Sequence, residues 1–369
     1  MKIILLCWRD TTHPQGGGSE RYLEHVAEYL AGQGHEVIFR TARHKKAPRS
    51  ELRRGVKYVR GGAKFSVYPS AWLWMLRQRG VDAVVDTHNG IPFFAGLFTS
   101  APTFVLNHHC HKEQWPVAGR VLGTFGWFLE SRVVPWVYRN KQWVTVSEAS
   151  RLDLRALGVH GVKIIENGVD PVPEFAPLKR EAATHLVTLS RLVPHKQIEH
   201  AVDVVAQLDN CVLDVIGDGW WADELRAYVV RKGVTGRVRL HGQVSEERKA
   251  ALLDRADVHL MPSRKEGWGL AVMEAAQHGV PTVGYTFGLR DAVKDGETGV
   301  LVARKEDLAR ATARVIASPE KLGENARCFA AQFSWEQTGK RWHTLIQEQT
   351  TTRAKTTARS VLERMFPRR

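Results

Sequence analysis

The residues with the clearest chemical content lie in the stretch MPSRKEGWGLAVMEAAQHGVPTV, positions 261–283. A strand is predicted to end near its first residue, and a loop then carries Glu266 to a helix that begins near Leu270. Glycines in such a turn let the backbone approach a ligand closely. The free N–H groups and the dipole of the new helix favour an anion there. The stretch therefore predicts a phosphate-binding turn.

Two carboxylates bracket this turn. Glu266 precedes it, and Glu274 lies about one turn into the helix. Carboxylate oxygens accept hydrogen bonds from ligand hydroxyls, and a nucleotide sugar carries hydroxyls on both sides of its diphosphate. We interpret the pair as a site for such a molecule. The alternative is an ordinary strand, loop and helix with two surface glutamates.

The elements that must position this turn follow a strand–helix rhythm that occurs twice. Apolar, β-branched runs predict strands at 2–7, 36–41, 81–88 and 103–108, then at 185–191, 212–219, 237–242, 257–263 and 281–286. Amphipathic stretches between the strands predict helices, so each half is expected to be an α/β domain with a parallel sheet.

The rhythm restarts after a stretch with three prolines at 170–177, which we interpret as a linker. We therefore predict two Rossmann-like domains, 1–170 and 178–334. A helix over 335–348 and a basic tail over 350–369 follow the second domain.

Composition sets the class of the chain. It has 369 residues, of which 43% are apolar and 25% charged, a mix that is typical of globular proteins and excludes disorder for most of it. No apolar run approaches the ~20 residues that span a bilayer. Four cysteines lie far apart without metal-ligand spacing, so we expect a reduced, cytoplasmic protein.

The net charge of +14 is concentrated in two segments. Residues 40–64 hold ten basic residues and one acidic residue, and residues 350–369 hold six basic residues and one acidic residue. Each is interpreted as a solvated loop or tail, or as a contact with anionic lipid, which is worth about 1 kcal/mol per basic residue. The rest of the chain is balanced, which disfavours a basic nucleic-acid-binding module.

The segment 115–143 contains four tryptophans with basic residues between them. Aromatic stripes usually pack inward, so we expect an amphipathic helix that faces the core. The alternative is a helix that lies on a membrane surface.

The pattern PSxxEGWGLxxxEAxxxGxP around Glu266 and Glu274 resembles the signature of family-four glycosyltransferases of the GT-B fold. The resemblance implies two Rossmann-like domains that face each other across a cleft. It implies that Glu266 contacts hydroxyls of the donor sugar and Glu274 those of the ribose. The distal phosphate would be held by the turn, whose residues are Gly267, Trp268, Gly269 and Leu270.

Other parts of the second half fit the same resemblance. In SRLVPHKQIE, Arg191 and Lys196 would clamp the diphosphate, where fixed cations stabilise the charge of the leaving group. A pair of this kind is otherwise a solvated surface pair. Gly217 and Gly219 in VIGDGWW would lie near the nucleotide, and Val244 would lie in a loop that cradles the base.

The first half carries the expected acceptor side. In PQGGGSE, Gly17 and Gly18 resemble a family loop whose amides face the donor phosphate. The family commonly has a histidine near the reacting centre, and NHHCHKEQW offers three candidates. We favour His109 as the catalytic one and assign His108 and His111 to the acceptor. No cysteine or carboxylate stands at ligand spacing, so no metal is expected.

A further candidate for acceptor contact is His88, with Asn89, after the predicted strand 81–88. It fits a structural histidine equally well. The sequence departs from the family at 287–291, where Phe-Gly-Leu-Arg-Asp replaces Gly-Gly-x-x-Glu, so donor-sugar contacts in that loop are in doubt.

The function implied is retaining transfer of a sugar from a nucleotide-diphosphate sugar to an acceptor hydroxyl, forming an α-linkage without a metal or cofactor. The acceptor is open between a lipid-linked molecule, a small cyclitol and a natural product. Expected partners are the donor and an anionic membrane at the two basic segments, with peripheral attachment to its inner face, and no nucleic acid. The alternatives are a GT-B-like nucleotide-sugar epimerase and a nucleic-acid-binding module. An NAD-dependent oxidoreductase is disfavoured because no GxGxxG follows the first strand.

Overall fold

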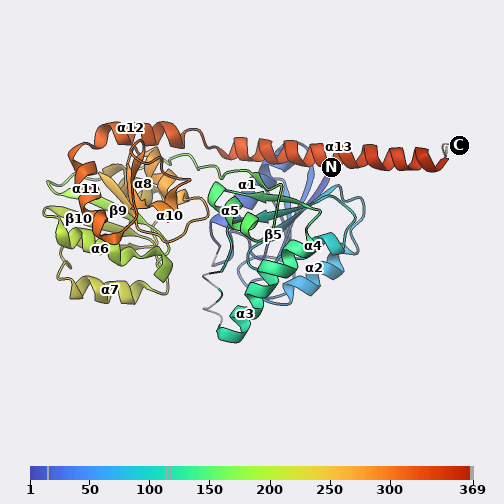
Figure 1. The fold of residues 1–369 in the computed structure, drawn as a ribbon, viewed down its shortest axis with the longest axis horizontal. Coiled ribbons are helices and arrows are strands. Elements are labelled where there is room, and N and C mark those ends of the chain that lie inside the picture. Colours follow the sequence, from blue (N-terminus) through green and yellow to red (C-terminus); the bar gives the residue numbers. More distant parts are fainter. Residues whose placement is uncertain (15, 113–114, 116–118, 366–369) are drawn as a thin grey trace. The chain divides into compact units, whose positions relative to one another are not determined.

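The computed structural model describes residues 1–14, 16–112, 115 and 119–365, with only the backbone described at 319 and 354–365. The chain divides into two compact units. Unit 1 comprises Met1–Gly168 together with Trp335–Arg369, and unit 2 comprises Val169–Ser334. Figure 1 shows that each unit is built from a sheet and helices, so the predicted α/β class is confirmed.

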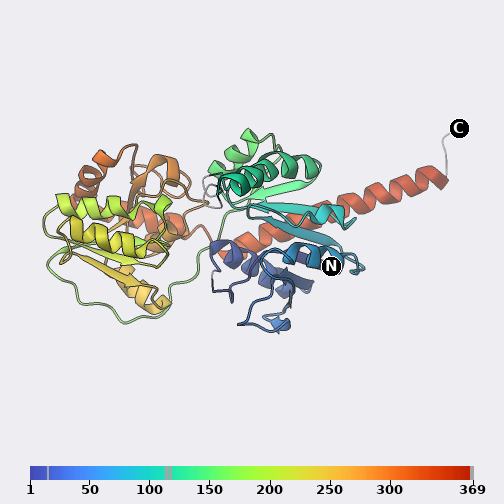
Figure 2. The same cartoon turned by 90° about the horizontal axis from the view of Figure 1, so that it is seen from below.

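The described residues of unit 1 form an eight-stranded sheet in the order β3-β4-β2-β1-β5-β6-β7-β8. Its pairings are parallel except between β3 and β4. The strands are β1 Lys2–Leu6, β2 Glu36–Thr41, β3 Ser50–Arg53, β4 Val56–Arg60, β5 Ala83–His88, β6 Thr103–Asn107, β7 Gln142–Thr145 and β8 Lys163–Ile164. Central strands such as β1 and β5 are buried on both faces because helices cover both (Figure 2).

The helices of unit 1 begin and end at recognisable signals. For example, the carboxylate of Glu20 accepts the backbone N–H of Gly17 at 2.9 Å and caps the first helix, α1. The α-helices are α1 Gly18–Gly32, α2 Val67–Met75, α3 Arg120–Phe128, α4 Val134–Val137, α5 Glu148–Ala156 and α13 Trp335–Met365. A 3₁₀ turn lies at Ala95–Leu97, and a π-helical turn at Leu129–Val133 joins α3 to α4.

The basic segment 40–64 is only in part the predicted solvated loop. Residues 42–49 lie outside the sheet and carry the exposed Arg43, Lys45, Lys46 and Arg49, whereas Ser50–Arg53 and Val56–Arg60 are strands. Its strands β3 and β4 form an antiparallel hairpin in which Arg53 pairs with Val56. The two-residue turn, Arg54 and Gly55, has φ of 48° and 78°. Positive φ at both turn positions matches the tight turns that suit the twist of a hairpin.

Several cations of this segment are paired inside unit 1. Arg60 is buried and donates from Nε to Asp10 Oδ2 at 2.6 Å. Arg40 is also buried and donates to Ser70 Oγ at 2.7 Å, while Arg53 pairs with Glu24 at 2.8 Å. The hydrogen bonds to Thr12 and Arg60 lower the pKa of Asp10 although burial opposes them. These cations therefore hold the fold together and are not available to an outside partner.

The described residues of unit 2 form a six-stranded parallel sheet in the order β11-β10-β9-β12-β13-β14. The strands are β9 Thr184–Leu189, β10 Cys211–Ile216, β11 Val238–Gly242, β12 Val258–Met261, β13 Thr282–Tyr285 and β14 Gly299–Val302. The order runs outward from β9 in one direction and then resumes beside it with β12. This reversal is the switch point at which open α/β sheets bind ligands.

The helices of unit 2 cover both faces of its sheet. They are α6 Ile198–Gln207, α7 Ala222–Arg231, α8 Glu246–Arg255, α9 Leu270–Gln277, α10 Thr286–Leu289, α11 Leu308–Ala317 and α12 Pro319–Ala330, with 3₁₀ turns at Pro194–Lys196 and Lys305–Asp307. Leu186 and Leu213 face one apolar cluster with α6 and α11, and Val187 and Ile216 face another with α8 and α9.

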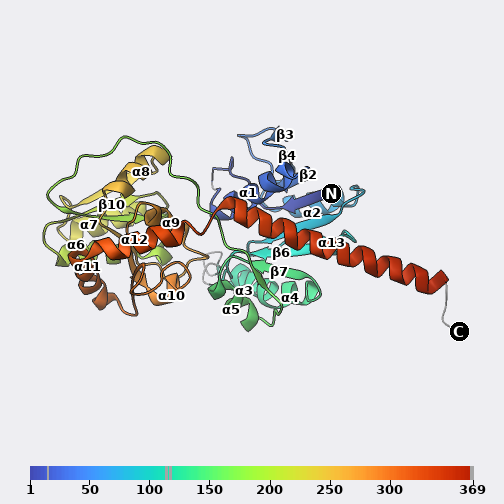
Figure 3. The same cartoon turned by 90° about the horizontal axis from the view of Figure 1, so that it is seen from above.

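Helix α13 is longer than predicted and belongs to unit 1. It runs without a break from Trp335 to Met365, so residues 350–365, expected as part of a tail, continue the helix. It lies along α1 (Figure 3). The buried Trp342 donates from Nε1 to the hydroxyl of Tyr22 at 2.6 Å, and that hydroxyl donates to the carbonyl of Ile165 at 2.9 Å. In the part of the chain that the structure describes, each helix is too short or too polar to cross a bilayer.

We predict that the protein loses stability in acid, because three of its histidines are buried. Burial lowers the pKa of His88 to about 4, and that of His108 and of His259 to about 3, from an ordinary 6.5. Below pH 6.5 the unfolded chain binds protons that the folded chain does not, so the free energy of unfolding falls as the pH drops toward 4. Burial raises the pKa of Asp86 to about 6, which offsets only part of this loss.

We expect the free energy of unfolding in urea to fall by at least ~1 kcal/mol between pH 7 and pH 5. The variant His259→Asn should flatten this dependence, because one of the histidines is removed. The matched variant His160→Asn should leave it unchanged, since His160 is exposed. A free energy of unfolding that is constant over this range would contradict the prediction.

Candidate functional site

The switch point of unit 2 brings together residues that the sequence analysis had singled out. The loop after β9 carries Arg191 and Lys196, and the loop after the neighbouring strand β12 carries Glu266. The backbone N–H of Arg264 donates to the carbonyl of His195 at 2.9 Å and ties the two loops together. The topology thus places the loop of Lys196 against the loop of Glu266.

Lys196 and Glu266 form a close ion pair. Lys196 Nζ lies 2.6 Å from Oε1 and 2.7 Å from Oε2 of Glu266, and the side chains are 15% and 12% exposed. Hydrogen bonds between two charged groups are the strong ones. The two side chains are exposed enough to contact a ligand, and their hydrogen bonds hold them in position to orient it.

His195 shows the effect of the charged side chains in this site. Burial lowers the pKa of His195 to about 4, and the positive charges of Lys196 and Arg191 lower it further although Glu266 opposes them. The Arg191 side chain is exposed. The imidazole is therefore neutral at pH 7.

Glu274, the second predicted carboxylate, has a partner that the sequence analysis missed. Its Oε1 lies 2.6 Å from Lys249 Nζ, which also contacts Glu246 at 2.7 Å. The charge of Glu274 raises the pKa of Lys249 although burial opposes it. No local spacing signals this partner, because Lys249 and Glu274 are 25 residues apart and lie in different helices.

Gly217 and Gly219 hold the loop of Arg191 in place. A Cβ at Gly217 would lie 2.0 Å from the carbonyl oxygen of Ser190, and one at Gly219 would lie 2.1 Å from that of Leu192. Both distances are far inside contact range, so only glycine lets the loop after β10 pack on the loop after β9. The packing shows that the two glycines position the loop of Arg191, and their contact with the donor stays a prediction.

The backbone between β12 and α9 forms the predicted glycine-containing turn. Gly269 has φ of 97°, and a Cβ there would lie 2.7 Å from Cβ of Ala292. Helix α9 then begins at Leu270. Trp268 is buried against the ring of Phe333, so its side chain anchors the turn and only its backbone can face a ligand. Gly267 lies half-buried in the same loop.

Two further loops lie at the carboxyl ends of strands in unit 2. Val244 is half-buried after β11, beside Ser245, whose hydroxyl accepts from the backbone N–H of Arg248 at 3.2 Å and caps α8. After β13, the ring of Phe287 is exposed and stacks on Tyr285. A Cβ at Gly288 would lie 2.3 Å from the carbonyl oxygen of Ser263, so this loop packs on the loop that leads to Glu266.

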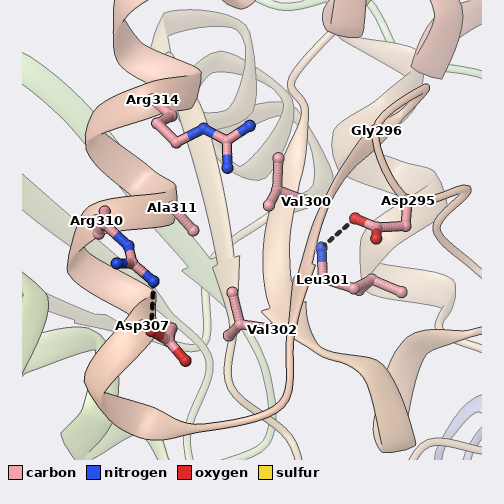
Figure 4. Close-up of a pocket in the computed structure, with 9 residues that line it drawn as sticks. All are labelled: Asp295, Gly296, Val300, Leu301, Val302, Asp307, Arg310, Ala311 and Arg314. Carbon is pink, nitrogen blue, oxygen red and sulfur yellow. Dashed lines mark hydrogen bonds and ion pairs between the residues drawn. The ribbon is translucent and has the colours of Figure 1, made fainter.

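A hollow at the edge of unit 2 contains none of the predicted residues. It measures about 240 Å³ and lies between β14 and α11, where Arg310 pairs with Asp307 and Asp295 accepts the backbone N–H of Leu301 (Figure 4). The candidate site is therefore defined by the loops at the switch point.

The switch point of unit 1 lies between β1 and β5. Some of the residues predicted for the acceptor side lie there. Asn89, just after β5, donates to Ser19 Oγ at 3.2 Å at the start of α1. The amide of Gly17 already donates to the buried Glu20, so its prediction as a phosphate contact is weakened, whereas that of Gly18 stays a prediction.

The four histidines near this edge have different environments. His88 is fully buried, 2.8 Å from Asn107 Nδ2 through Nδ1, which fits the structural alternative better than acceptor contact. His108 is buried with its ring edge against Tyr22. His109 and His111 stack on each other with centroids 4.5 Å apart and are both half-buried. These two remain the candidates that can face a ligand.

Glu130, which was not among the predicted site residues, organises this histidine loop. Its carboxylate is fully buried and accepts the backbone N–H of His111 at 2.8 Å and the Nε1–H of Trp115. The hydrogen bond to His111 and the charges of His88 and His111 lower the pKa of Glu130 although burial opposes them. It lies in the π-helical turn, a local widening often found at functional sites. The signal was a single acidic residue in the basic and apolar stretch 119–141.

We expect Glu130→Gln to lower the free energy of unfolding by about 1–3 kcal/mol, because one of the two buried donors loses its acceptor. The displaced His111 loop should also lower catalytic turnover. Urea unfolding and turnover are compared with those of Glu148→Gln, a half-buried ion-paired glutamate of the same unit whose side chain is 38% exposed. Equal stability and turnover of the two variants would show that Glu130 does not organise the loop.

Two family models match the chain. The model described as Glycosyltransferase Family 4 matches residues 16–172, and the model described as Glycosyl transferases group 1 matches residues 174–329. The chain belongs to the family-four glycosyltransferases. The glycosyltransferase is therefore an enzyme, and its Lys196–Glu266 pair lies within the second matched region.

One of two similar curated enzymes aligns over nearly the full length of the glycosyltransferase, and the other over about half of it. It is 25% identical to glycogen synthase of Mycobacterium tuberculosis over 395 residues, covering 91% of this chain and 92% of that enzyme. It is 40% identical to D-inositol 3-phosphate glycosyltransferase of Geodermatophilus obscurus over 201 residues, covering 47% and 44% of the two chains.

Solved structures show the fold. Sucrose-phosphate synthase from Thermosynechococcus elongatus matches with a TM-score of 0.83 at 21% identity, covering 95% of this chain and 99% of that one. HepE from Anabaena, in complex with UDP and glucose, matches with a TM-score of 0.75 at 18% identity, covering 94% and 100%. The glycosyltransferase thus has the predicted GT-B fold.

Proposed function

We propose that this glycosyltransferase moves a sugar from a nucleoside diphosphate to an acceptor hydroxyl with retention of the anomeric configuration, forming an α-linkage. The observation that carries the proposal is the Lys196–Glu266 pair at the switch point of unit 2. It holds a cation suited to a phosphate beside a carboxylate suited to sugar hydroxyls. Both family models describe glycosyltransferases, which favours transfer over the epimerase and nucleic-acid-binding alternatives.

In the proposed reaction the bond from the anomeric carbon to the diphosphate oxygen breaks, and a bond to the acceptor oxygen forms on the same face. The acceptor proton passes to the departing phosphate oxygen. Lys196 and Arg191 stabilise the negative charge that grows on the diphosphate, as does the N-terminus of α9. Glu266 accepts hydroxyls of the sugar and Glu274 those of the ribose.

The ion pairs support a route without an enzyme nucleophile. Both oxygens of Glu266 accept from Lys196, and Glu274 accepts from Lys249. Each carboxylate is thus held as a hydrogen-bond acceptor. Retaining glycosidases instead place a free carboxylate about 5 Å from the acid, where it attacks the sugar.

The donor is proposed to be a nucleotide sugar because the HepE structure, a relative in fold, holds UDP and glucose. We leave the base open, since the loop that includes Val244 would contact it largely through backbone groups. The exposed ring of Phe287 beside the loop of Glu266 supplies an apolar surface where the family has glycine. It is suited to the C–H face of the donor sugar.

The acceptor is proposed to meet Asn89, His109 and His111 of unit 1. The similarity to a D-inositol 3-phosphate glycosyltransferase supports a cyclitol, and a lipid-linked molecule or natural product is equally compatible with these polar groups. Because Lys196 and Arg191 supply positive charge at the diphosphate, we propose that transfer needs no metal. Cytoplasmic location, peripheral at the inner face of a membrane, stays a prediction.

A thermal-shift screen of nucleoside diphosphates and nucleotide sugars tests this proposal. We expect one base to raise the melting temperature most, and its sugar donor to be consumed in the presence of EDTA. The product should show the anomeric proton coupling of the donor. Consumption that requires a divalent metal, or an inverted product, would contradict the corresponding part of the proposal.

A further inference from the structure

Helix α3 carries a row of large apolar side chains on its outer side, contrary to the expectation that this segment faces the core. Val121 is 81% exposed, Leu122 67%, Phe125 58% and Phe128 52%. Beyond the π-helical turn, Trp136 of α4 is 67% exposed. We call these five residues the α3 ridge. Exposed apolar side chains gathered in this way mark interaction surfaces.

The inner side of α3 explains why the ridge faces outward. Gly123 and Gly126 are buried, and a Cβ at Gly126 would lie 2.2 Å from the ring of Trp115. Small residues thus let the helix pack closely on unit 1, and Glu130 fixes the same side through Trp115. The orientation is set by these contacts, so the ridge has no place in the core.

The exposed charges within the ridge's own segment, 119–141, are all positive. Arg120, Arg132 and Arg139 are exposed, and Arg139 lies over the ring of Trp136 at 5.5 Å. Within 119–141, all of which the structure describes, the one carboxylate is Glu130, and it is buried. An apolar ridge flanked by cations fits a lipid surface, in which phosphate headgroups lie over acyl chains.

A second copy of the chain fits this surface less well. Two ridges packed against each other about a twofold axis would bring the arginines of both copies together, and like charges oppose association. A lipid surface offers the opposite charge. The electrostatics therefore select an anionic bilayer as the occupant.

We propose that the α3 ridge docks unit 1 on an anionic lipid bilayer. Val121, Leu122, Phe125 and Phe128 enter the boundary between headgroups and acyl chains, Trp136 lies at the same level, and Arg120, Arg132 and Arg139 contact lipid phosphates. The attachment does not depend on donor or acceptor chemistry, so it stands or falls separately from the proposed sugar transfer. It is separate from the contact expected of the 40–64 segment, where Arg40 and Arg60 are buried but Arg43, Lys45 and Lys46 are exposed.

Vesicle sedimentation of the full chain, without donor or acceptor, tests the proposal. Vesicles of phosphatidylcholine with phosphatidylglycerol are compared with pure phosphatidylcholine at low and high salt. We expect the wild type to bind the anionic vesicles, and Leu122→Ser with Phe125→Ser to weaken binding about tenfold or more through lost apolar burial. Arg120→Glu with Arg132→Glu should abolish the preference for anionic lipid.

The control is Val230→Ser, which removes a similarly exposed apolar side chain in α7 of unit 2 and should bind as the wild type does. Melting temperatures confirm that each variant is folded. Wild-type protein that does not sediment with anionic vesicles overturns the proposal, as does a ridge variant that binds unchanged. A wild-type dimer that the ridge substitutions convert to monomers overturns it in favour of self-association.

Discussion

Glu266→Gln lowers kcat/KM for sugar transfer by about 10²–10³-fold, the usual effect of removing one positioned group that stabilises a transition state. In the free enzyme both oxygens of Glu266 accept from Lys196 Nζ, at 2.6 and 2.7 Å. The amide of glutamine keeps one acceptor and presents N–H groups at the other position. It therefore disorders Lys196 and loses the acceptor for a sugar hydroxyl. Steady-state turnover of the donor measures the effect.

The matched control is Asp223→Asn in the same unit. Asp223 also pairs with a cation, Arg226, but its side chain is 96% exposed and lies in α7. The substitution makes the same change of charge outside the site, so turnover should stay close to that of the wild type. A Glu266→Gln enzyme that turns over as fast as the Asp223→Asn enzyme would remove Glu266 from the site.

Lys196→Ala has an effect of similar size, about 10²–10³-fold, and it falls mainly on kcat. The reason is that negative charge grows on the diphosphate as the bond to the sugar breaks, so the cation binds the transition state more tightly than the bound donor. Lys232→Ala is the control, since Lys232 pairs with Asp203 at 2.7 Å on a more exposed part of unit 2. A change in KM alone would mean that Lys196 only binds the donor.

The double variant Lys196→Ala with Glu266→Gln extends this test. Each side chain is the partner of the other, so the first substitution already removes part of what the second one does. We expect the double variant to lose less activity than the product of the two single losses. Multiplicative losses would mean that the pair seen in the free enzyme has no part in catalysis.

The donor half was predictable because its signals are local. Glycines, a strand that ends near Met261 and a helix that begins at Leu270 all lie within one short stretch, and the structure reproduces them. The contact of Lys196 with Glu266 was not predictable from spacing. It depends on β9 lying beside β12, and the order of strands in a sheet is a tertiary property.

Helix α3 shows that the pattern of apolar residues does not always predict which side of a helix is buried. The same pattern of Val121, Leu122, Phe125 and Phe128 fits a helix that faces inward or outward, and aromatic residues favoured the inward choice. The buried side is marked by Gly123 and Gly126, which contribute little to an apolar pattern. Only the position of Trp115 on Gly126 shows which side is inside.

The environments of the basic segment and of Glu130 could not be predicted for a related reason, namely that the partners of these residues are distant in sequence. Arg60 is neutralised by Asp10, fifty residues away, and Glu130 meets the backbone of His111, nineteen residues away. A count of charges along the chain cannot see such pairs. It therefore treated buried, paired cations in the same way as free ones.

The central claim is that the switch point of unit 2, with Lys196 and Glu266, releases a nucleoside diphosphate from a sugar donor. Phosphorus NMR of donor turnover tests it most directly, because it follows the bond that breaks. We predict that the wild type and Asp223→Asn convert the donor to nucleoside diphosphate, whereas Lys196→Ala and Glu266→Gln leave nearly all of it intact over the same period. Conversion by both site variants at the wild-type rate would contradict the account.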